Sequence, residues 1–301
     1  MKLQDILEKV DQQSKKRVAV AQAADKEVLT AVKHAIEHDL ANFLLVGEES
    51  EIQRIAEAVE LDLSDKRIEL KHVSDQSLTA TEAVKSVSEG YADVVMKGQI
   101  DTKLVLKAVL NKDYGLRAGK VLSHVAVFEV PNRERFVLLT DSGMNITPTL
   151  EEKAQIISNA VEVANGLGIE LPKVAPLAAV EVVNPTMPAT VDAAALTQMQ
   201  KRGQIKGCIV DGPLAFDNAV SIEAANQKGI QSEVAGQADI LLVPAIEVAN
   251  ALYKSFVYFA GAKVAGVISG AKAPIVLTSR SDTAESKLYS LALALLTSKE
   301  N

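Results

Sequence analysis

The chain has 301 residues, a length that favours two lobes over one hydrophobic core. Its formal net charge is −7 and no long run of Lys and Arg stands out, which argues against a nucleic-acid or anionic-membrane partner. Hydrophobic residues make up 48% and aromatic residues only 4%, so Ala, Val, Ile and Leu must build the core. That composition suits a buried parallel sheet covered by helices.

The single cysteine, Cys208, excludes an intramolecular disulfide, and it lies in an apolar run that favours a core position over a nucleophile. Acidic and amide residues interrupt the N-terminal sequence MKLQDILEKVDQQSKKR, where a signal peptide needs an apolar stretch. No run of about 18 apolar residues occurs. We therefore expect a cytoplasmic protein.

From residue 17 onward, short apolar runs alternate with longer segments of helical period, which is typical of crossover units on a parallel sheet. The first predicted strand, at residues 18–21, precedes a helical face that runs from Val28 to Ile36. Further strands are predicted at 43–46, 68–71, 94–96, 121–130, 136–139, 174–180, 209–210, 240–243, 264–268 and 275–277.

The apolar runs at 121–130 and 136–139 flank a Pro-Asn-Arg sequence, which predicts a hairpin that interrupts the alternation. We expect the lobe boundary there. The first α/β lobe is predicted to comprise residues 1–125 and 270–301, and the second 126–269. The C-terminal segment is expected to return to the first lobe because no polar linker separates it from the rest.

Thr149 and Glu152 have the spacing of a capping box. A helix is therefore expected to begin there and to run through Ala164, where Gly166 and Gly168 end it.

Ligands bind beyond the carboxyl ends of strands in open α/β sheets, so the residues after each apolar run are candidates for a site. Five such ends carry unusual residues, namely Lys97-Gly98, Thr140-Asp141-Ser142-Gly143, Asp211-Gly212-Pro213, Pro244 and Thr278-Ser279-Arg280-Ser281-Asp282.

The Ser279-Arg280 pair combines a hydroxyl, a guanidinium fork and free helix N–H groups at a strand-to-helix turn, which is typical of an oxyanion site. Asp282 and Glu285 also have the spacing of an N-cap and its capping-box partner, so a purely structural role stays open.

Two other groups are ambiguous. Asp211 and Asp217 place two carboxylates in one loop, which suits proton transfer or cation binding but equally an ordinary turn. Asn250, Tyr253 and Lys254 share one helical face, which points either at a cleft or at solvent. Dinucleotide, P-loop and nucleophile-elbow motifs do not occur.

Four segments in this order resemble the phosphate acetyl/butyryltransferase family, and the likeness runs from about Lys97 to the C-terminus. They are TDSGMNITPTLEEK from Thr140, DGPLAFDNAVS from Asp211, ADILLVPAIEVANALYKS from Ala238 and GVISGAKAPIVLTSRSDTAE from Gly266. The stretch MKGQIDTKLVLKAVLNKDYGLRAGKVLSHVAVFEVP from Met96, together with Pro213, is most similar to the butyryl-type branch.

The resemblance implies a two-lobed α/β/α sandwich with mostly parallel sheets and a cleft between the lobes, as in isocitrate/isopropylmalate-type dehydrogenases. It implies an acyltransferase that moves a short acyl group, with butyryl expected, reversibly between coenzyme A and inorganic phosphate. Coenzyme A is then a substrate, no cofactor is tightly bound, no metal is needed, and a homo-oligomer (a dimer or a multiple of dimers) is expected.

The resemblance also implies the catalytic residues. Arg280 would bind the phosphoryl group, Ser279 would donate a hydrogen bond, and a carboxylate would be the base. The acetyl-type branch has S-R-G-C and then an acidic pair, a pattern that this sequence lacks, so Asp282 and Glu285 both remain candidates. Expected substrate-binding residues are Lys97, Gly98, Arg117, Ser123, Asp211, Gly212, Pro213, Asn250, Tyr253 and Lys254, with Lys254, Lys272 or Arg117 meeting the phosphates of coenzyme A.

Three alternatives stay open. Phosphate acetyltransferase activity differs from the expected activity only in the acyl group. A metal- and NAD(P)-dependent dehydrogenase would share the fold, but the metal ligands that the sequence offers, Asp211 and Asp217, have no histidine near them. A catalytically silent sensor of acyl phosphate or coenzyme A would bind without turnover.

Overall fold

The computed structural model describes residues 1–10, 15–278 and 282–298. Two compact units can be distinguished. The N/C unit consists of Leu3–Lys120 and Ala265–Asn301, and the middle unit consists of Val121–Val264 with Met1–Lys2. Each unit is described by itself, and the lobe boundaries expected from the sequence stay a prediction. Among the described helices, none is long and apolar enough to cross a membrane.

The sheet of the N/C unit has the strand order β3-β2-β1-β4-β11-β10. All neighbours in it pair in parallel except β10 and β11, which are antiparallel. The strands are β1 (Arg17–Ala21), β2 (Asn42–Gly47), β3 (Ile68–His72), β4 (Val94–Lys97), β10 (Lys263–Ser269) and β11 (Ile275–Val276).

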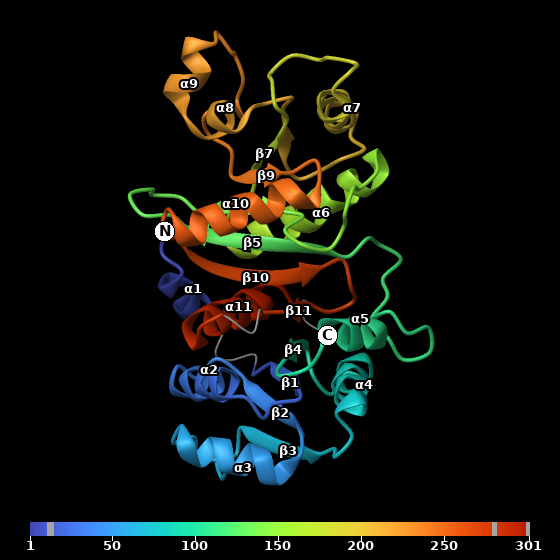
Figure 1. The fold of residues 1–301 in the computed structure, drawn as a ribbon, viewed down its shortest axis with the longest axis vertical. Helices are drawn as coiled ribbons and strands as arrows, with labels where there is room; N and C mark the ends of the chain where they lie inside the picture. Colours follow the sequence, from blue (N-terminus) through green and yellow to red (C-terminus); the bar gives the residue numbers. More distant parts are fainter. Residues whose placement is uncertain (11–14, 279–281, 299–301) are drawn as a thin grey trace. The chain divides into compact units, whose positions relative to one another are not determined.

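One helix, α1, precedes the first strand of this unit, and the other helices follow strands, as the alternation in the sequence predicts. Their bounds are α1 (Gln4–Lys9), α2 (Lys26–Glu37), α3 (Glu49–Ala58), α4 (Gln76–Ser88), α5 (Thr102–Val109) and α11 (Ala284–Thr297). Aspartate side chains at Asp25, Asp75 and Asp101 accept backbone N–H groups of the first turns of α2, α4 and α5. Helix α11, drawn in red in Figure 1, packs against α2 and buries most of its residues.

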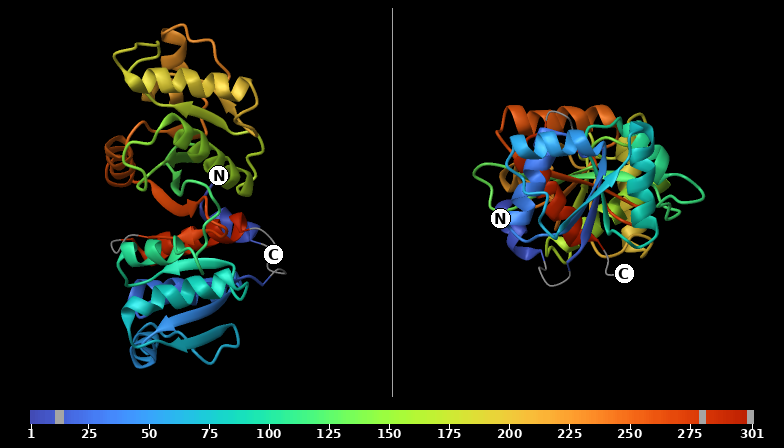
Figure 2. Two further views of the ribbon diagram at one scale, coloured as in Figure 1. Left: turned by 90° about the vertical axis from the view of Figure 1, so that its right-hand side faces the viewer. Right: turned by 90° about the horizontal axis from the view of Figure 1, so that it is seen from below.

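The sheet of the middle unit has the strand order β5-β6-β9-β7-β8. Its strands are β5 (Ser123–Glu129), β6 (Val137–Thr140), β7 (Lys173–Pro176), β8 (Ile209–Val210) and β9 (Ile240–Leu242), and its helices are α6 (Leu150–Gly166), α7 (Pro188–Lys201), α8 (Phe216–Val220), α9 (Ile222–Gln227) and α10 (Ile246–Tyr258). Helices α6 and α7, yellow-green and yellow in Figure 2, pack against each other.

Most element predictions are confirmed. Strands β5 and β6 form the predicted antiparallel hairpin, with Val127 opposite Leu138. Thr149 and Glu152 make both hydrogen bonds of the predicted capping box at the start of α6. The mixed α/β architecture with mostly parallel pairing confirms the predicted fold class.

The predicted strand at 174–180 is too long. Strand β7 ends at Pro176 because its neighbours β9 and β8 already end at Leu242 and Val210, which leaves no ladder to extend. Beyond it, an isolated bridge joins Leu177 to Leu214.

Candidate active site

The carboxyl ends of β4 and β11 lie at the same edge of the N/C sheet because the two strands are parallel neighbours. Lys97 ends β4 and is only 5% exposed. Its Nζ donates hydrogen bonds to the carbonyl oxygens of Gly98, at 3.2 Å, and of Thr278, at 3.4 Å. We call Lys97, Gly98 and Thr278 the basic corner.

Gly98 permits a close approach between two backbone segments. A Cβ atom there would lie 2.0 Å from the carbonyl oxygen of Gln22, which follows β1. The Gly98 N–H donates to the carbonyl oxygen of Ala21 at 2.8 Å. Any side chain at this position would push the corner away from β1, which explains the glycine beside the lysine.

Two buried polar atoms near these strand ends lack a hydrogen-bond partner in the described part of the chain. They are the hydroxyl oxygen of Thr278 and the amide oxygen of Gln22. Thr278 is 7% exposed and directly precedes the predicted catalytic pair, and Gln22 adopts a left-handed φ of 56°. Ser279 and Arg280 themselves lie outside the described residues.

The chain after the catalytic pair begins α11, but its cap is not the predicted one. Thr283, not Asp282, is the N-cap, and its side chain accepts the Ser286 N–H at 3.2 Å. The prediction of an Asp282–Glu285 capping box is therefore wrong, because the helix begins one residue later than that spacing required. The carboxylate of Glu27 on α2 accepts the Ala284 N–H at 2.8 Å, which satisfies another free donor of this helix end.

The two candidate bases have different surroundings. Asp282 is half-buried, and its carbonyl oxygen accepts a 2.6 Å hydrogen bond from the buried ammonium of Lys287. Glu285 is exposed, and its Oε1 accepts the Tyr289 hydroxyl at 2.9 Å. Both carboxylates lie within the first turn of α11 or just before it.

Arg117 and Lys272 are brought close together. Arg117 forms an antiparallel bridge with Ala271, and the Lys272 N–H donates to the carbonyl oxygen of Leu116 at 2.8 Å. Both basic side chains are exposed on this short two-stranded pairing of the N/C unit.

In the middle unit, the end of β6 is organised by Asp141, which is 3% exposed. Its carboxylate accepts the backbone N–H groups of His124, Gly143, Met144 and Asn145 at 2.9 to 3.1 Å. The Asn145 amide donates to it as well. We call Asp141 and the loop to Asn145 the acidic corner.

Ser123, a predicted substrate-binding residue, lies in the interior at 0% exposure. Its hydroxyl accepts the Asn159 side-chain amide at 2.8 Å, and the same amide donates to the carbonyl oxygen of Val121 at 2.9 Å. In this structure Ser123 links β5 to α6 in the core of the middle unit.

The Asp211-Gly212-Pro213 loop follows β8 and packs under α7. The carbonyl oxygen of Gly212 accepts a hydrogen bond from the Thr197 hydroxyl at 3.3 Å. A Cβ atom on Gly212 would lie 3.1 Å from the carbonyl oxygen of Pro176. The Gly212–Pro213 peptide is cis. Asp211 is half-buried, whereas Asp217 is exposed in the first turn of α8.

The three polar residues of α10 lie on one side of the helix but differ in their surroundings. The Tyr253 ring packs edge-on against Phe128 of the core, with 5.2 Å between ring centroids. Asn250 and Lys254 are exposed. The helical spacing is as predicted, but the tyrosine is partly buried against the hydrophobic core.

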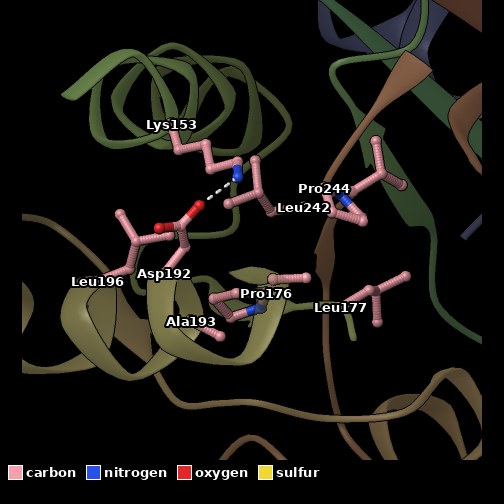
Figure 3. A pocket seen from close by; sticks show the side chains of 10 residues that line it. Lys153, Pro176, Leu177, Asp192, Ala193, Leu196, Leu242 and Pro244 are labelled. Carbon is pink, nitrogen blue, oxygen red and sulfur yellow. Dashed lines mark hydrogen bonds and ion pairs between the residues drawn. The ribbon is translucent and has the colours of Figure 1, made fainter. Parts of the chain in front are cut away.

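A small pocket opens at the carboxyl ends of β7 and β9, between α6 and α7 (Figure 3). In it the ammonium of Lys153, which is 5% exposed, lies 2.6 Å from a carboxylate oxygen of Asp192. Apolar residues form the rest of its lining, namely Pro176, Leu177, Ala189, Ala193, Leu196, Leu242, Val243 and Pro244.

Cys208 has the buried position expected for a core residue, and burial raises the pKa of its thiol to about 11. At neutral pH the thiolate is therefore negligible. Within the described ranges, no three His, Cys, Asp or Glu side chains are grouped so that they could hold a metal ion.

Sequence reasoning missed Lys153, and it singled out Thr278 and Asp141 only as members of unusual strand ends. Lys153 could have been noticed, because it lies in phase with the apolar positions Ile156 and Ile157 of α6, where a charge needs a partner. No local pattern reveals that the Thr278 hydroxyl is buried or that Asp141 organises its loop.

Comparisons with known proteins place this chain in a family. The family model described as "Phosphate acetyl/butaryl transferase" matches residues 1–82 and 64–295. A protein of Bacillus subtilis (strain 168) named "Probable phosphate butyryltransferase" is 56% identical over 100% of this chain and 99% of its own length. The "Phosphate acetyltransferase" of Thermotoga maritima is 50% identical over 93% of this chain and 94% of its own.

Solved structures agree. A branched-chain phosphotransacylase from Enterococcus faecalis V583 has a TM-score of 0.81 and 38% identity, covering 94% of this chain and 98% of that one. A 4-hydroxythreonine-4-phosphate dehydrogenase from Klebsiella pneumoniae has a TM-score of 0.54 at 10% identity over 95% and 100%, which shows a shared fold alone. The chain belongs to the phosphate acetyl/butyryltransferase family.

Proposed function

We propose that this protein is a phosphate acyltransferase that moves a short acyl group, with butyryl preferred, reversibly between coenzyme A and inorganic phosphate. The observation that carries the proposal is the full-length likeness to a relative named as a probable phosphate butyryltransferase, at 56% identity. The relative named as a phosphate acetyltransferase is 50% identical, so the choice of acyl group is a separate point to test.

The chemistry needs no covalent enzyme intermediate. The thiolate sulfur of coenzyme A attacks the carbonyl carbon of the acyl phosphate, and the carbon–oxygen bond to phosphate breaks. A thiol with an ordinary pKa of about 8.5 is mostly protonated at neutral pH, so Asp282 or Glu285 takes its proton and returns it to the departing phosphate. The high pKa of Cys208 supports this direct route, because that thiol is a poor nucleophile.

Arg280 and Ser279 supply the charge stabilisation. The guanidinium fork binds two phosphoryl oxygens, and the serine hydroxyl donates to the phosphate or to the developing oxyanion. The proposed substrate-binding set is the one expected from the sequence. Within it, the pairing of the segments that carry Arg117 and Lys272 supports a joint contact with the phosphates of coenzyme A.

We further propose that the enzyme works in the cytoplasm as a homo-oligomer, with coenzyme A as a substrate and without a tightly bound cofactor. The oligomer and the role of coenzyme A rest on the family resemblance, and the compartment rests on the single cysteine, which suits a reducing environment.

The test is an assay of the purified protein with butyryl-CoA or acetyl-CoA, with and without inorganic phosphate, that follows thiol release. We expect release that depends on phosphate and is faster with butyryl-CoA. Arg280→Ala should lower the rate roughly a hundredfold, the effect of losing one strong donor to the reacting group, whereas the exposed Arg202→Ala should leave it unchanged. If no short acyl-CoA releases thiol in the presence of phosphate, the proposal is wrong.

A further inference from the structure

The pocket in Figure 3 is a cavity that the proposed mechanism does not use. It lies at the carboxyl ends of β7 and β9, between α6 and α7, and all of these elements belong to the middle unit. Ligands bind at this edge of open α/β sheets. Apart from Lys153 and Asp192, every residue that lines the pocket is apolar. The cavity therefore offers most of its surface to a hydrocarbon group.

The two charged residues argue against an anionic occupant. The ammonium of Lys153, a residue 5% exposed, lies 2.6 Å from a carboxylate oxygen of Asp192, so its charge is already balanced. A phosphate group would have to compete with that carboxylate for the ammonium, whereas an uncharged chain would leave the pair intact. Because Lys153 belongs to α6 and Asp192 to α7, the pair also joins the two helices beside the cavity.

The pocket is small. Its empty space, with the open mouth included, is about 180 Å³. A water molecule takes about 30 Å³ in the liquid and a methylene group is of similar size, so the closed part holds only the end of a short chain. Ala189 and Ala193 lie one helical turn apart on α7 and both line the pocket. A longer side chain at either position would fill this space.

The pocket shares its walls with the loop after β8, which the sequence predicts to bind substrate. A Cβ atom on Gly212 of that loop would lie 3.2 Å from the Cδ atom of Pro176 and 3.4 Å from the Cβ atom of Ala193. Both of these residues line the pocket. Leu177, which also lines it, forms the isolated bridge with Leu214 of the same loop. A substrate that contacts this loop therefore lies close to the pocket.

We propose that the pocket binds the end of the acyl chain, the two carbons by which a butyryl group exceeds an acetyl group. The inference rests on the proposed function for the identity of the substrate. It assigns the acyl preference to Ala189 and Ala193 of α7 and to Val243, which follows β9. Burial of each added methylene group in an apolar site favours the longer chain, and an acetyl group lacks the carbons that would gain from it.

Two substitutions change the pocket in opposite directions. Ala189→Leu fills it at a half-buried position, and Val243→Ala enlarges it. Ala194→Leu is the matched control, because Ala194 is half-buried on the same helix but lies outside the pocket lining. The readout is the ratio of kcat/KM for butyryl-CoA to kcat/KM for acetyl-CoA. Effects on coenzyme A, on phosphate or on the fraction of folded protein cancel in this ratio.

We expect Ala189→Leu to lower the ratio about tenfold, the usual effect of one methylene group in a hydrophobic site. Val243→Ala should raise the kcat/KM of hexanoyl-CoA relative to that of butyryl-CoA several-fold, because the enlarged pocket accepts a longer chain. Ala194→Leu should leave both ratios within about twofold of the wild type. Unchanged ratios in the two pocket variants, or equal changes in the control, would overturn the inference.

Binding without turnover separates this inference from the proposed function. Isothermal titration calorimetry without phosphate compares the Kd of butyryl-CoA with that of acetyl-CoA. If the wild type releases no thiol but binds butyryl-CoA more tightly, and Ala189→Leu removes the difference, the pocket assignment stands and the enzyme assignment fails. If the wild type turns over both substrates without preferring butyryl-CoA in rate or in affinity, the enzyme assignment stands and the inference fails.

Discussion

The acidic corner and the basic corner occupy the same kind of place, the carboxyl end of a parallel strand, yet they complete their hydrogen bonding differently. Asp141 accepts three backbone N–H groups and a side-chain amide from its own loop, and a fourth backbone N–H from His124 on β5. Lys97 contacts main-chain carbonyls, and the adjacent Thr278 hydroxyl has no described partner.

The difference distinguishes a residue that shapes a loop from a residue that is available to bind a ligand. A charge whose hydrogen-bonding capacity is filled by the chain fixes the shape of a loop and has little left for a ligand. A buried donor that the chain leaves unfilled is costly unless a ligand fills it. A position at a strand end therefore identifies candidate ligand-binding residues. Whether the hydrogen-bonding groups of such a residue are already filled by the chain decides which candidate can bind a ligand.

The largest effect should come from removing the carboxylate of the acidic corner. Asp141→Ala leaves the donors of the 143–145 loop without an acceptor and should lower the free energy of unfolding by about 3–5 kcal/mol. Urea denaturation measures the change. The exposed Glu170→Ala should stay within about 0.5 kcal/mol of the wild type. A small loss at Asp141 would show that the loop holds its shape without the carboxylate.

At the basic corner, the stability of the fold should depend on the close backbone approach at Gly98. Gly98→Ala places a Cβ about where the Gln22 carbonyl lies, so the backbone must shift, at a cost of roughly 2–4 kcal/mol. Thermal unfolding checks this. Gly119→Ala is an informative contrast, because no atom lies within 4 Å of its added Cβ and only its φ of 72° is unfavourable. Equal losses in the two variants would mean that the close approach to Gln22 is unimportant.

The pocket in Figure 3 offers an intermediate case, a buried lysine of α6 with a carboxylate partner. Asp192→Asn leaves the Lys153 ammonium buried without its countercharge and should cost about 1–3 kcal/mol, moderated because the Asp192 side chain is 29% exposed. The double variant Lys153→Met with Asp192→Leu should recover much of that loss, since no buried charge remains. Denaturation curves of the three proteins give the comparison, and additive losses would contradict it.

The smallest effect should be at the surface pair of Asp65 and Arg67. The Arg67 guanidinium hydrogen-bonds the Asp65 carboxylate at 2.6 Å and lowers its pKa from 3.8 to about 2. A lowered pKa stabilises the fold above the unfolded value of about 3.8, and that contribution is lost as pH falls towards 2. Asp65→Asn should therefore cost up to about 1 kcal/mol at pH 7, after allowance for solvent screening, and almost nothing near pH 2.

Stability measured from pH 7 to pH 2 checks this last prediction. Asp113→Asn, at an exposed carboxylate, serves as the control and should leave the free energy of unfolding within about 0.5 kcal/mol of the wild type.

The fold was largely predictable because its signals are local. Apolar runs placed the strands, the hairpin turn was visible as Pro-Asn-Arg, and the capping box at Thr149 formed as expected. Errors occurred where tertiary context decides, as at β7, whose end depends on where β8 and β9 stop. The cap of α11 was misplaced because Asp282 and Thr283 are both good caps in sequence and only the structure selects Thr283.

The strand ends that carry the candidate residues were predictable from the sequence, whereas the surroundings of those residues were not. Lys97 and Gly98 were singled out from their place at a strand end, and the structure puts them beside Thr278. Thr278 was named only as part of another strand end, because its unpartnered hydroxyl is a property of the folded environment. Tyr253 shares helical spacing with Asn250 and Lys254, but spacing does not reveal that its ring packs on Phe128.

The N/C unit draws its sheet from two distant parts of the chain, with β11 beside β4 and α11 packed on α2. A ribosome therefore synthesises the whole of Val121–Val264 before the segment that begins at Ala265. Until that segment emerges, β4 exposes an unpaired edge and α2 an uncovered apolar face, both of which invite aggregation. The order of synthesis thus completes the strands of the middle unit first, and the basic corner, which needs Thr278, can be assembled only at the end.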